Sequence, residues 1–204
     1  MRKPIQLTLI IFILGINVVC TKPAINEPDN NLTAQSSEKA TTSTTITYLI
    51  PKGQQYSKPN PLVFTAVSKV SFIAVFDSSC IYKTVDPANQ DDINKLYGFS
   101  DCNTHHLTNS ARIGWRWSKD SLRLFGFVHN DGNMLWQEIT SAPIGSKIRC
   151  SITCLADTYS FVVNGKTTSL PRHCSGKYTR YKLFPYFGGD EVAPHDIKIR
   201  ITEL

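Results

Sequence analysis

The stretch from residue 100 to residue 117, SDCNTHHLTNSARIGWRW, collects side chains that could move protons and neutralise negative charge. It contains one aspartate, two adjacent histidines and two arginines: Asp101, His105, His106, Arg112 and Arg116. A histidine can exchange a proton near neutral pH, and a guanidinium can hold a carboxylate with two parallel hydrogen bonds. A simpler interpretation stays open, in which the histidines bond the loop backbone and Arg112 pairs with Asp101. The inventory for acid–base chemistry is present, but no complete catalytic motif accompanies it.

Aromatic residues near this stretch offer a second kind of chemistry, the stacking of flat faces on sugar rings. Trp115 and Trp117 are two apart on an expected strand, so they share a face and are buried or exposed together. Aromatics of a β-sandwich are also the natural filling of its core, and both interpretations stay open. For a binding site, the expected ligand-contacting residues are Tyr97, His105, His106, Arg112, Trp115, Arg116, Trp117 and Tyr186.

The segment before the last strand brings carboxylates together after a Gly-Gly pair. Glycines at 188 and 189 allow a sharp turn, and Asp190, Glu191 and Asp196 follow within one loop. Hard cations such as Ca²⁺ are bound by several oxygen ligands, so these residues predict a structural calcium site. Ordinary turn chemistry is the alternative, with Asp190 bonding nearby amides and Asp196 pairing with an arginine.

Most of the chain shows the period-two alternation or short apolar runs of β-strands. Short turns separate these runs, and Asn164-Gly165 is a strong hairpin signal. One helix is expected within 86–99, where Asp86 can cap the first turn and Pro87 suits its start. Many short strands and one short helix predict an all-β fold, a two-sheet antiparallel jelly-roll sandwich. The expected strands lie within 61–80, 110–118, 121–130, 134–140, 146–156, 158–170, 181–189 and 195–204.

The end of the chain resembles a known fold family. The hairpin TYSFVVNGKTTSL, the aromatic strand YKLFPYFGG and the final strand HDIKIRI look like the concanavalin A-like jelly rolls of lectins, laminin G-like modules, glucanases and polysaccharide lyases. This resemblance implies a curved sheet with a concave, ligand-binding face. A longer set, DINKLYGFSDC, SARIGWRW and LFPYFGGDEVAPHDI, also resembles an uncharacterised group of predicted bacterial surface lipoproteins.

The enzymes of this fold family have motifs that can be checked. Its glucanases use a Glu-x-Asp-x-x-Glu strand, because two carboxylates must flank the sugar bond, and here Glu138 stands alone. Its lyases place an arginine, a Gln-x-His and a tyrosine-rich strand on separate strands, and the sequence has no Gln-x-His. We therefore expect a non-enzymatic binding role, with a glycan or another surface molecule as partner. Two alternatives stay open: a polysaccharide lyase-like enzyme centred on His105, His106 and Arg112, and a structural or protein-binding surface component.

The N-terminal residues indicate export. Residues 1–20 have a basic start and a short apolar run, as in a signal peptide. Residues 21–45 are polar and poor in anything to bury, which is typical of a disordered tether. Cys20 at their junction predicts a lipid anchor, so that the protein would meet a membrane only through lipid, at the cell surface or as an outer membrane lipoprotein; ordinary secretion is the alternative. Residues 46–204 remain for the β-sandwich domain.

Five cysteines beyond residue 20 permit disulfides but cannot all pair. Cys80 and Cys102 flank a loop and are the expected pair, and Cys174 could reach Cys150 or Cys154. The net charge of +6 comes from scattered lysines and arginines. Scattered charge does not form the basic stripe of a nucleic-acid-binding surface, so no nucleic acid partner is expected.

Overall fold

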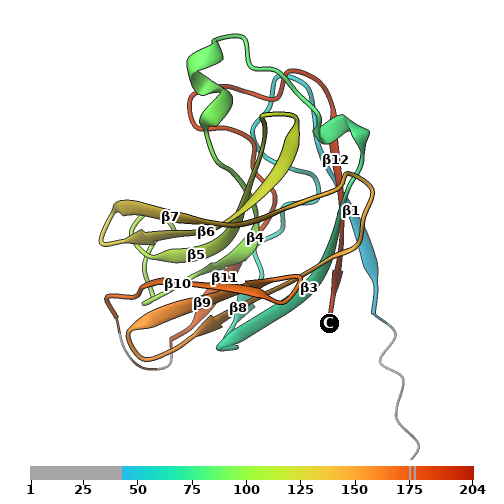
Figure 1. Ribbon diagram of the computed structural model, residues 1–204. Helices are drawn as coiled ribbons and strands as arrows, with labels where there is room; N and C mark the ends of the chain where they lie inside the picture. Colours follow the sequence, from blue (N-terminus) through green and yellow to red (C-terminus); the bar gives the residue numbers. More distant parts are fainter. Residues whose placement is uncertain (1–42, 175, 177) are drawn as a thin grey trace, which may run out of the picture. The chain divides into compact units, whose positions relative to one another are not determined.

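The strands of this protein form where apolar side chains that can be buried alternate with side chains that stay partly exposed. In the segment Lys69–Phe76 every second side chain, beginning with Val70 and Phe72, is buried, while the side chains between them are partly exposed. A strand with this pattern must place one face on a core. The computed structural model describes residues 43–174, 176 and 178–204 (Figure 1). The expected signal peptide, the lipidation site Cys20 and nearly all of the expected tether lie outside these residues, and none of the helices described is long and apolar enough to span a membrane.

The first sheet has six antiparallel strands in the order β1-β12-β3-β8-β9-β10. Its bounds are β1 Thr45–Ile50, β3 Lys69–Phe76, β8 Ile148–Cys154, β9 Thr158–Val163, β10 Lys166–Pro171 and β12 Ile197–Glu203. The β9–β10 hairpin turns at Asn164 and Gly165, whose φ angles of 48° and 82° are left-handed. Asn-Gly is the pair that tolerates such a turn best, which confirms the hairpin expected there.

The second sheet has six strands in the order β2-β11-β4-β5-β6-β7. Its bounds are β2 Phe64–Thr65, β4 Asn94–Ser100, β5 Ser110–Ser118, β6 Ser121–Asn130, β7 Asn133–Ala142 and β11 Arg180–Leu183. Figure 1 shows this sheet packed over strands β8, β9 and β10 of the first. The all-β, two-sheet jelly-roll sandwich expected from the sequence is confirmed.

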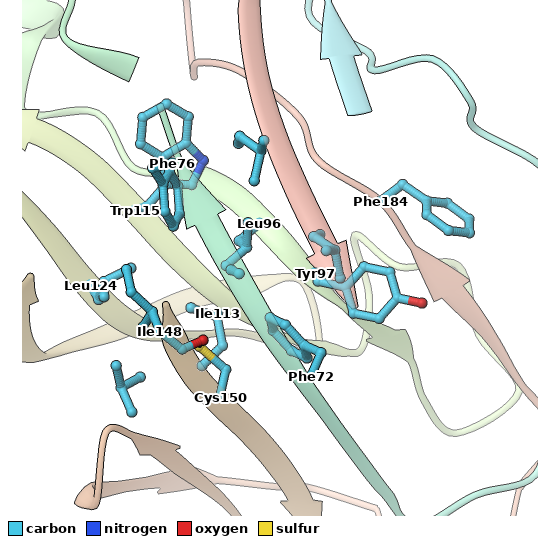
Figure 2. Close-up of a cluster of buried hydrophobic side chains, with 14 of the residues drawn as sticks. Phe72, Phe76, Leu96, Tyr97, Ile113, Trp115, Leu124, Ile148, Cys150 and Phe184 are labelled. Carbon is cyan, nitrogen blue, oxygen red and sulfur yellow. The ribbon is translucent and has the colours of Figure 1, made fainter. Parts of the chain in front are cut away.

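The core lies between the two sheets (Figure 2). The Trp115 ring contacts Phe76 across the sandwich, at 5.2 Å between ring centroids, and meets Tyr82 edge-on at 5.9 Å. Gly126 is required by this packing, because a Cβ atom there would lie 2.8 Å from the Phe161 ring. The buried side chains of the two facing layers include Phe72, Phe76, Leu96, Tyr97, Ile113, Trp115, Leu124 and Ile148.

The expected helix within 86–99 is wrong in most of its length. Asp86 does cap a turn by accepting a hydrogen bond from the Ala88 amide, but the helix is the five-residue 3-10 segment η2, Pro87–Asp91. The part of the chain that the structure describes contains one more 3-10 segment, η1, Ser78–Cys80. The chain then enters strand β4 at Asn94, because Leu96, Tyr97 and Phe99 all bury their side chains in the sandwich. Burial of these residues outweighs the capping signal.

The expected disulfide between Cys80 and Cys102 is also wrong. Cys102 pairs with Cys174, with their Cα atoms 6.0 Å apart, so Cys174 does not pair with Cys150 or Cys154 either. Cys80 is buried beside β12, where its thiol donates to the Lys198 carbonyl at 3.5 Å. The order of the strands explains the error, since η1 packs on β12 while Cys102 follows β4 in the other sheet.

Candidate ligand-binding groove

Alternation on strand β5 sends two sets of side chains in opposite directions. Ala111, Ile113 and Trp115 enter the core, and Arg112 lies on the other face of the sheet. The register pairs Arg112 with Gly98 of β4 and with Phe127 of β6. Glycine is required at 98, because a Cβ atom there would lie 2.0 Å from the Ala111 carbonyl oxygen and 2.9 Å from Cγ of Arg112. The arginine stem therefore lies directly over β4.

A groove with a volume of about 420 Å³ opens above Arg112 on this outer face. Its floor comes from strands β4, β5, β6 and β11, one wall from the loop that precedes β2, and another from the loop between β4 and β5. The residues that line it together with Arg112 include Tyr56, Leu62, Lys95, His106, His129, Met134, Tyr181, Leu183 and Tyr186.

Arg112 lacks a counter-charge within the described part of the chain. Only 5% of the residue is exposed, no carboxylate forms an ion pair with it, and its Nε has no hydrogen-bond partner among the described residues. The guanidinium lies over the Phe127 ring, 5.5 Å from its centroid. Burial lowers the pKa of Arg112 to about 10, which leaves it charged at neutral pH. A buried charge of this kind is costly unless something pairs with it.

Lys95 adds a second cation beside Arg112. Its ammonium donates to the Gly188 carbonyl at 3.2 Å and lies 4.9 Å from the centroid of the Phe127 ring. Burial, and next the charge of Arg112, lower the pKa of Lys95 to about 8, although Asp92 opposes the shift. Both effects mean that an anion in the groove would be favoured, because it would relieve the repulsion between the two cations.

Two histidines face the same space in their neutral form. The His106 amide donates to the Tyr181 hydroxyl at 2.8 Å, and its Nδ1 lies 3.0 Å from the same oxygen. His129 on β6 has its Nδ1 3.4 Å from the Ser110 hydroxyl. Burial, and then Arg112, lower the pKa of each histidine to about 4. Lys182 also lines the groove, but its ammonium pairs with Glu203 at 2.6 Å, so at pH 7 the positive charge without an acidic partner belongs to Arg112 and Lys95.

Aromatic and apolar side chains form the rim. The Tyr56 ring meets Tyr186 edge-on at 5.0 Å, and more than half of Tyr56 is exposed. Leu62 is 69% exposed on the same side. Exposed rings beside a buried cation give a surface that is apolar and charged together, which suits a ligand with the same mixture.

The other half of this face is closed by side chains. Ile93 packs on Phe125 and Phe127 in a small apolar cluster. Arg116 lies over the Phe125 ring at 5.0 Å, and its guanidinium pairs with Asp91 at 3.4 Å and bonds the Asp91 carbonyl. Arg116, expected among the ligand-contacting residues, is therefore held by η2 and does not line the groove.

The structure sorts the remaining expected ligand residues. His106, Arg112 and Tyr186 line the groove, and His105 stacks on His106 with 4.2 Å between ring centroids without lining it. Trp115 and Trp117 were expected to contact the ligand, and this is wrong. Trp115 is fully buried in the core, and Trp117 packs against the same core. The two tryptophans do share a face, as alternation predicts, and that face is the inner one.

The expectation that Tyr97 contacts the ligand is also wrong, and the cause lies in the pairing of its strand. The pairing of β4 with β5 shifts between Lys95 and Tyr97, a β-bulge that breaks the alternation of the strand. Without it Lys95 and Tyr97 would point the same way. With it Lys95 reaches the groove, while the Tyr97 ring enters the core and its hydroxyl donates to Glu203.

Lys95, Tyr181 and Tyr56 belong to the groove but were not expected there. Lys95 lies within the segment expected to be a helix, and a helix at this place gives no reason to expect its side chain near Arg112. Tyr181 lies on an expected strand, and its place next to the His106 loop depends on the pairing of β11 with β4. Strand alternation combined with the hairpin β5–β6 does supply one usable signal, since it places His129 on the same face as Arg112.

The expected calcium ligands are not brought together. The Glu191 carboxylate accepts hydrogen bonds from the Val85 and Asp86 amides and from the Asn89 side chain, which lower its pKa. Asp196 accepts from the Lys52 amide at 2.9 Å. The carboxylates of Glu191 and Asp196 thus accept hydrogen bonds from the chain itself, and the partner of Asp196 is the Lys52 amide and not the arginine expected in the turn-chemistry alternative.

Within the described residues, the one trio of possible metal ligands that lies close together is Asp101, Cys102 and Cys174. Both cysteines are in the disulfide, so they have no thiolate to offer a metal. Calcium binding remains a prediction from the sequence.

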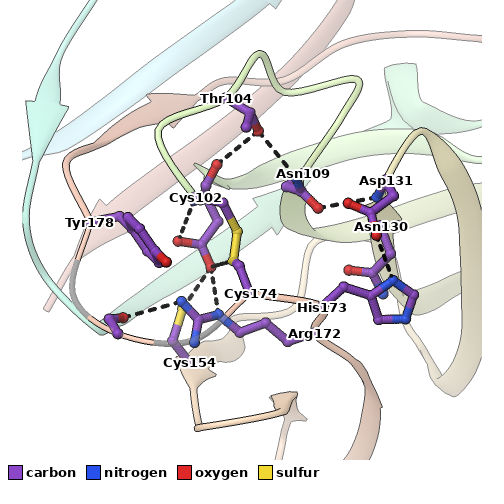
Figure 3. Close-up of a disulfide and its surroundings, with 12 residues drawn as sticks. Cys102, Thr104, Asn109, Asn130, Asp131, Cys154, Arg172, His173, Cys174 and Tyr178 are labelled. Carbon is purple, nitrogen blue, oxygen red and sulfur yellow. Dashed lines mark hydrogen bonds and ion pairs between the residues drawn. A yellow bond between two sulfur atoms is a disulfide. The ribbon is translucent and has the colours of Figure 1, made fainter.

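The simpler interpretation of the sequence predicted a pair between Asp101 and Arg112, and this prediction is wrong. Its Oδ2 accepts from Nε of Arg172 at 2.7 Å and from the Tyr159 hydroxyl at 2.9 Å, and its Oδ1 lies 2.9 Å from Nε of Arg180. Figure 3 shows Arg172 beside the Cys102–Cys174 disulfide. Burial alone would raise the pKa of Asp101, but the bond from Arg172 and the other donors hold it below its ordinary value. This second arginine cluster is neutralised from within the fold.

No protein-family model and no curated protein matches this sequence. Solved structures with a similar fold include a non-specific endo-β-1,3(4)-glucanase of family GH16, with 10% identity, a TM-score of 0.49, and coverage of 79% of this chain and 71% of that one. The alginate lyase of Alteromonas sp. 272 has 8% identity and a TM-score of 0.48, over 78% and 85% of the two chains. The Bacteroides ovatus mixed linkage glucan GH16 protein has 9% identity and a TM-score of 0.49, over 79% and 81%.

At these identities and TM-scores the likeness carries no argument about what this chain binds. The two antiparallel sheets confirm the jelly-roll sandwich that the resemblance to concanavalin A-like proteins implies. The resemblance to predicted bacterial surface lipoproteins stays a prediction.

Proposed function

We propose that the protein binds an acidic glycan, a polysaccharide that carries carboxylates, in the groove above Arg112. The observation that carries this proposal is the Arg112 guanidinium, which is buried, charged and without a counter-charge in the described chain. A carboxylate of the ligand would supply the missing partner through a charge-assisted hydrogen bond. Export to a cell surface, with a lipid anchor on Cys20, accords with such a ligand and stays part of the proposal.

The surroundings of Arg112 support a sugar as the rest of the ligand. Lys95 adds charge, the Tyr181 hydroxyl and His129 offer hydrogen bonds, and the Tyr56 and Tyr186 rings offer flat faces. A groove of about 420 Å³ is within the range of small-molecule sites and accommodates part of an extended chain. A purely apolar ligand would leave both cations unpaired, so the groove favours an amphipathic, negatively charged one.

The test compares an oligouronate with the same oligosaccharide after its carboxyl groups have been reduced to alcohols. We expect calorimetric titration to show at least tenfold tighter binding of the acidic form, because one charge-assisted hydrogen bond contributes about 1.5–3 kcal/mol. Arg112→Met should bring the acidic form down to the affinity of the neutral one. Equal affinity of the wild-type chain for both forms, or binding of neither, would refute the proposal.

A lyase-like enzyme is the second candidate, and one observation favours it. Around Arg112 the groove holds His106, His129 and Tyr186, side chains of the types that move protons. Against it, the strand leading to His129 has Phe127-Val128 in front of the histidine, so a Gln-x-His is absent here too. Incubation with an oligouronate should leave absorbance in the near ultraviolet unchanged if the protein only binds. A steady rise from unsaturated product, lost in His129→Ala, would make it an enzyme.

A further inference from the structure

A row of directly paired residues crosses the outer face of the second sheet. Gly98 of β4 pairs with Arg112 of β5, Arg112 with Phe127 of β6, and Phe127 with Trp136 of β7. Residues paired in this way point to the same side of a sheet. The Trp136 ring therefore lies on the face that carries Arg112, at the open end of the row.

Trp136 differs from the other two tryptophans in being open to solvent. It is 52% exposed, whereas Trp115 is fully buried and Trp117 packs against the core. Met134, two residues earlier on the same face of β7, is 56% exposed and lines the groove. Met134 and Trp136 thus form an apolar ledge that continues from the groove to the edge of the sheet.

Phe127 lies between Arg112 and Trp136 but cannot itself receive a ring. Lys95 lies over it at 4.9 Å and Arg112 at 5.5 Å, and only 2% of Phe127 is exposed. The next exposed aromatic face in the row is therefore that of Trp136. Two strand spacings separate β5 from β7, which places it about 10 Å from Arg112.

We propose that Trp136 is a stacking platform for a second part of the glycan, so that the groove takes an acidic oligosaccharide of at least three units lying across β5, β6 and β7. This inference rests on the proposed function, because it assumes that the carboxylate of one unit sits on Arg112. Adjacent pyranose rings in an extended chain repeat at a spacing close to that of neighbouring strands, so the unit two places along reaches Trp136. Tryptophan is well suited to this contact, since its large face is apolar and its edge bonds hydroxyls.

Binding of oligouronates of one to four units tests the proposal. For the wild-type chain the affinity should rise about tenfold between two and three units, the increment of one added aromatic contact. Trp136→Ala should remove that step and keep the affinity for one unit, whereas Trp136→Phe should keep most of the step. Leu155→Ala, a residue 48% exposed at the other sheet, is the matched surface control and should behave as wild type.

Tryptophan fluorescence gives a second readout from the same titration. Trp136 is the exposed one of the three tryptophans, so its emission should shift to the blue when three or more units bind. Trp136→Phe should abolish the shift. If Trp136→Ala binds every length as wild type does, the platform is wrong although the proposed function stands. If the wild-type chain binds no oligouronate of any length, the proposed function itself is wrong.

Discussion

The fold buries arginine at two sites, the cluster around Asp101 and the site of Arg112, and these differ in one respect. Arg172 and Arg180 share the carboxylate of Asp101, and Arg172 also donates to the carbonyls of Leu155 and Ala156. Arg112 forms no ion pair with any acid of the described chain; its guanidinium lies over the Phe127 ring, and Lys95 is a second cation close to it. The charges of Arg172 and Arg180 are compensated within the protein, whereas the charge of Arg112 is not compensated and lines a groove.

The difference separates a structural role from a binding role. Burying a charge is unfavourable unless geometry and hydrogen bonds compensate it, and the Asp101 cluster shows that this fold can provide both. At Arg112 it provides neither, yet the guanidinium remains under the groove. The unpaired charge therefore indicates a site that a ligand completes.

The largest effect should come from breaking the Asp101 cluster. Asp101→Asn removes the charge that compensates Arg172 and Arg180, so we expect the free energy of unfolding to fall by about 3–5 kcal/mol. Urea denaturation measures it. Asp131→Asn is the control, because its pair with His173 is at least half exposed and should change stability by less than about 1 kcal/mol. Equal losses in the two variants would mean that the Asp101 cluster does not stabilise the fold.

Removing the unpaired charge of Arg112 should increase the stability of the fold. Arg112→Met keeps an unbranched side chain over Gly98 and Phe127 but ends the cost of burying an unpaired cation. We expect the free energy of unfolding to rise by about 1 kcal/mol, while binding of the acidic glycan is lost. A loss of more than about 2 kcal/mol in urea denaturation would show that Arg112 holds the fold together and that the contrast between the clusters is wrong.

The smallest effect should appear in the pH dependence of binding. The pKa of Lys95 is lowered to about 8 in the free protein, and an anion beside it favours the protonated form, so its pKa rises on binding. Affinity for an oligouronate should therefore be full below pH 8 and decrease several-fold as the pH rises above 8. Lys95→Gln should weaken binding at pH 7 and flatten this decrease. A wild-type affinity that is constant from pH 7 to pH 9.5 would exclude Lys95 from the site.

Much of the fold could be predicted from alternation, because alternation is what places a strand on a core. The hairpin at Asn164-Gly165, the close approach at Gly126 and the two-sheet sandwich follow from short-range patterns. His106, Arg112 and Tyr186, which the sequence predicts as ligand-contacting residues, line one groove, and their binding of a ligand stays a prediction.

The failures depend on long-range pairing. A β-bulge in β4 exchanges the directions of Lys95 and Tyr97, and no local pattern marks where the register shifts. The Cys102–Cys174 bond spans 72 residues and joins segments that only the order of strands brings together. Whether Trp115 or Trp136 is the exposed tryptophan likewise depends on which face of which strand meets the other sheet.

In the proposed complex the Arg112 guanidinium binds a carboxylate of the glycan. A crystal structure of the protein with an oligouronate tests it most directly. We expect one carboxylate within hydrogen-bond distance of the Arg112 guanidinium, with the sugar chain in the groove. A sugar bound elsewhere on the surface, or an Arg112 left without an anionic partner when the glycan is bound, would contradict the account.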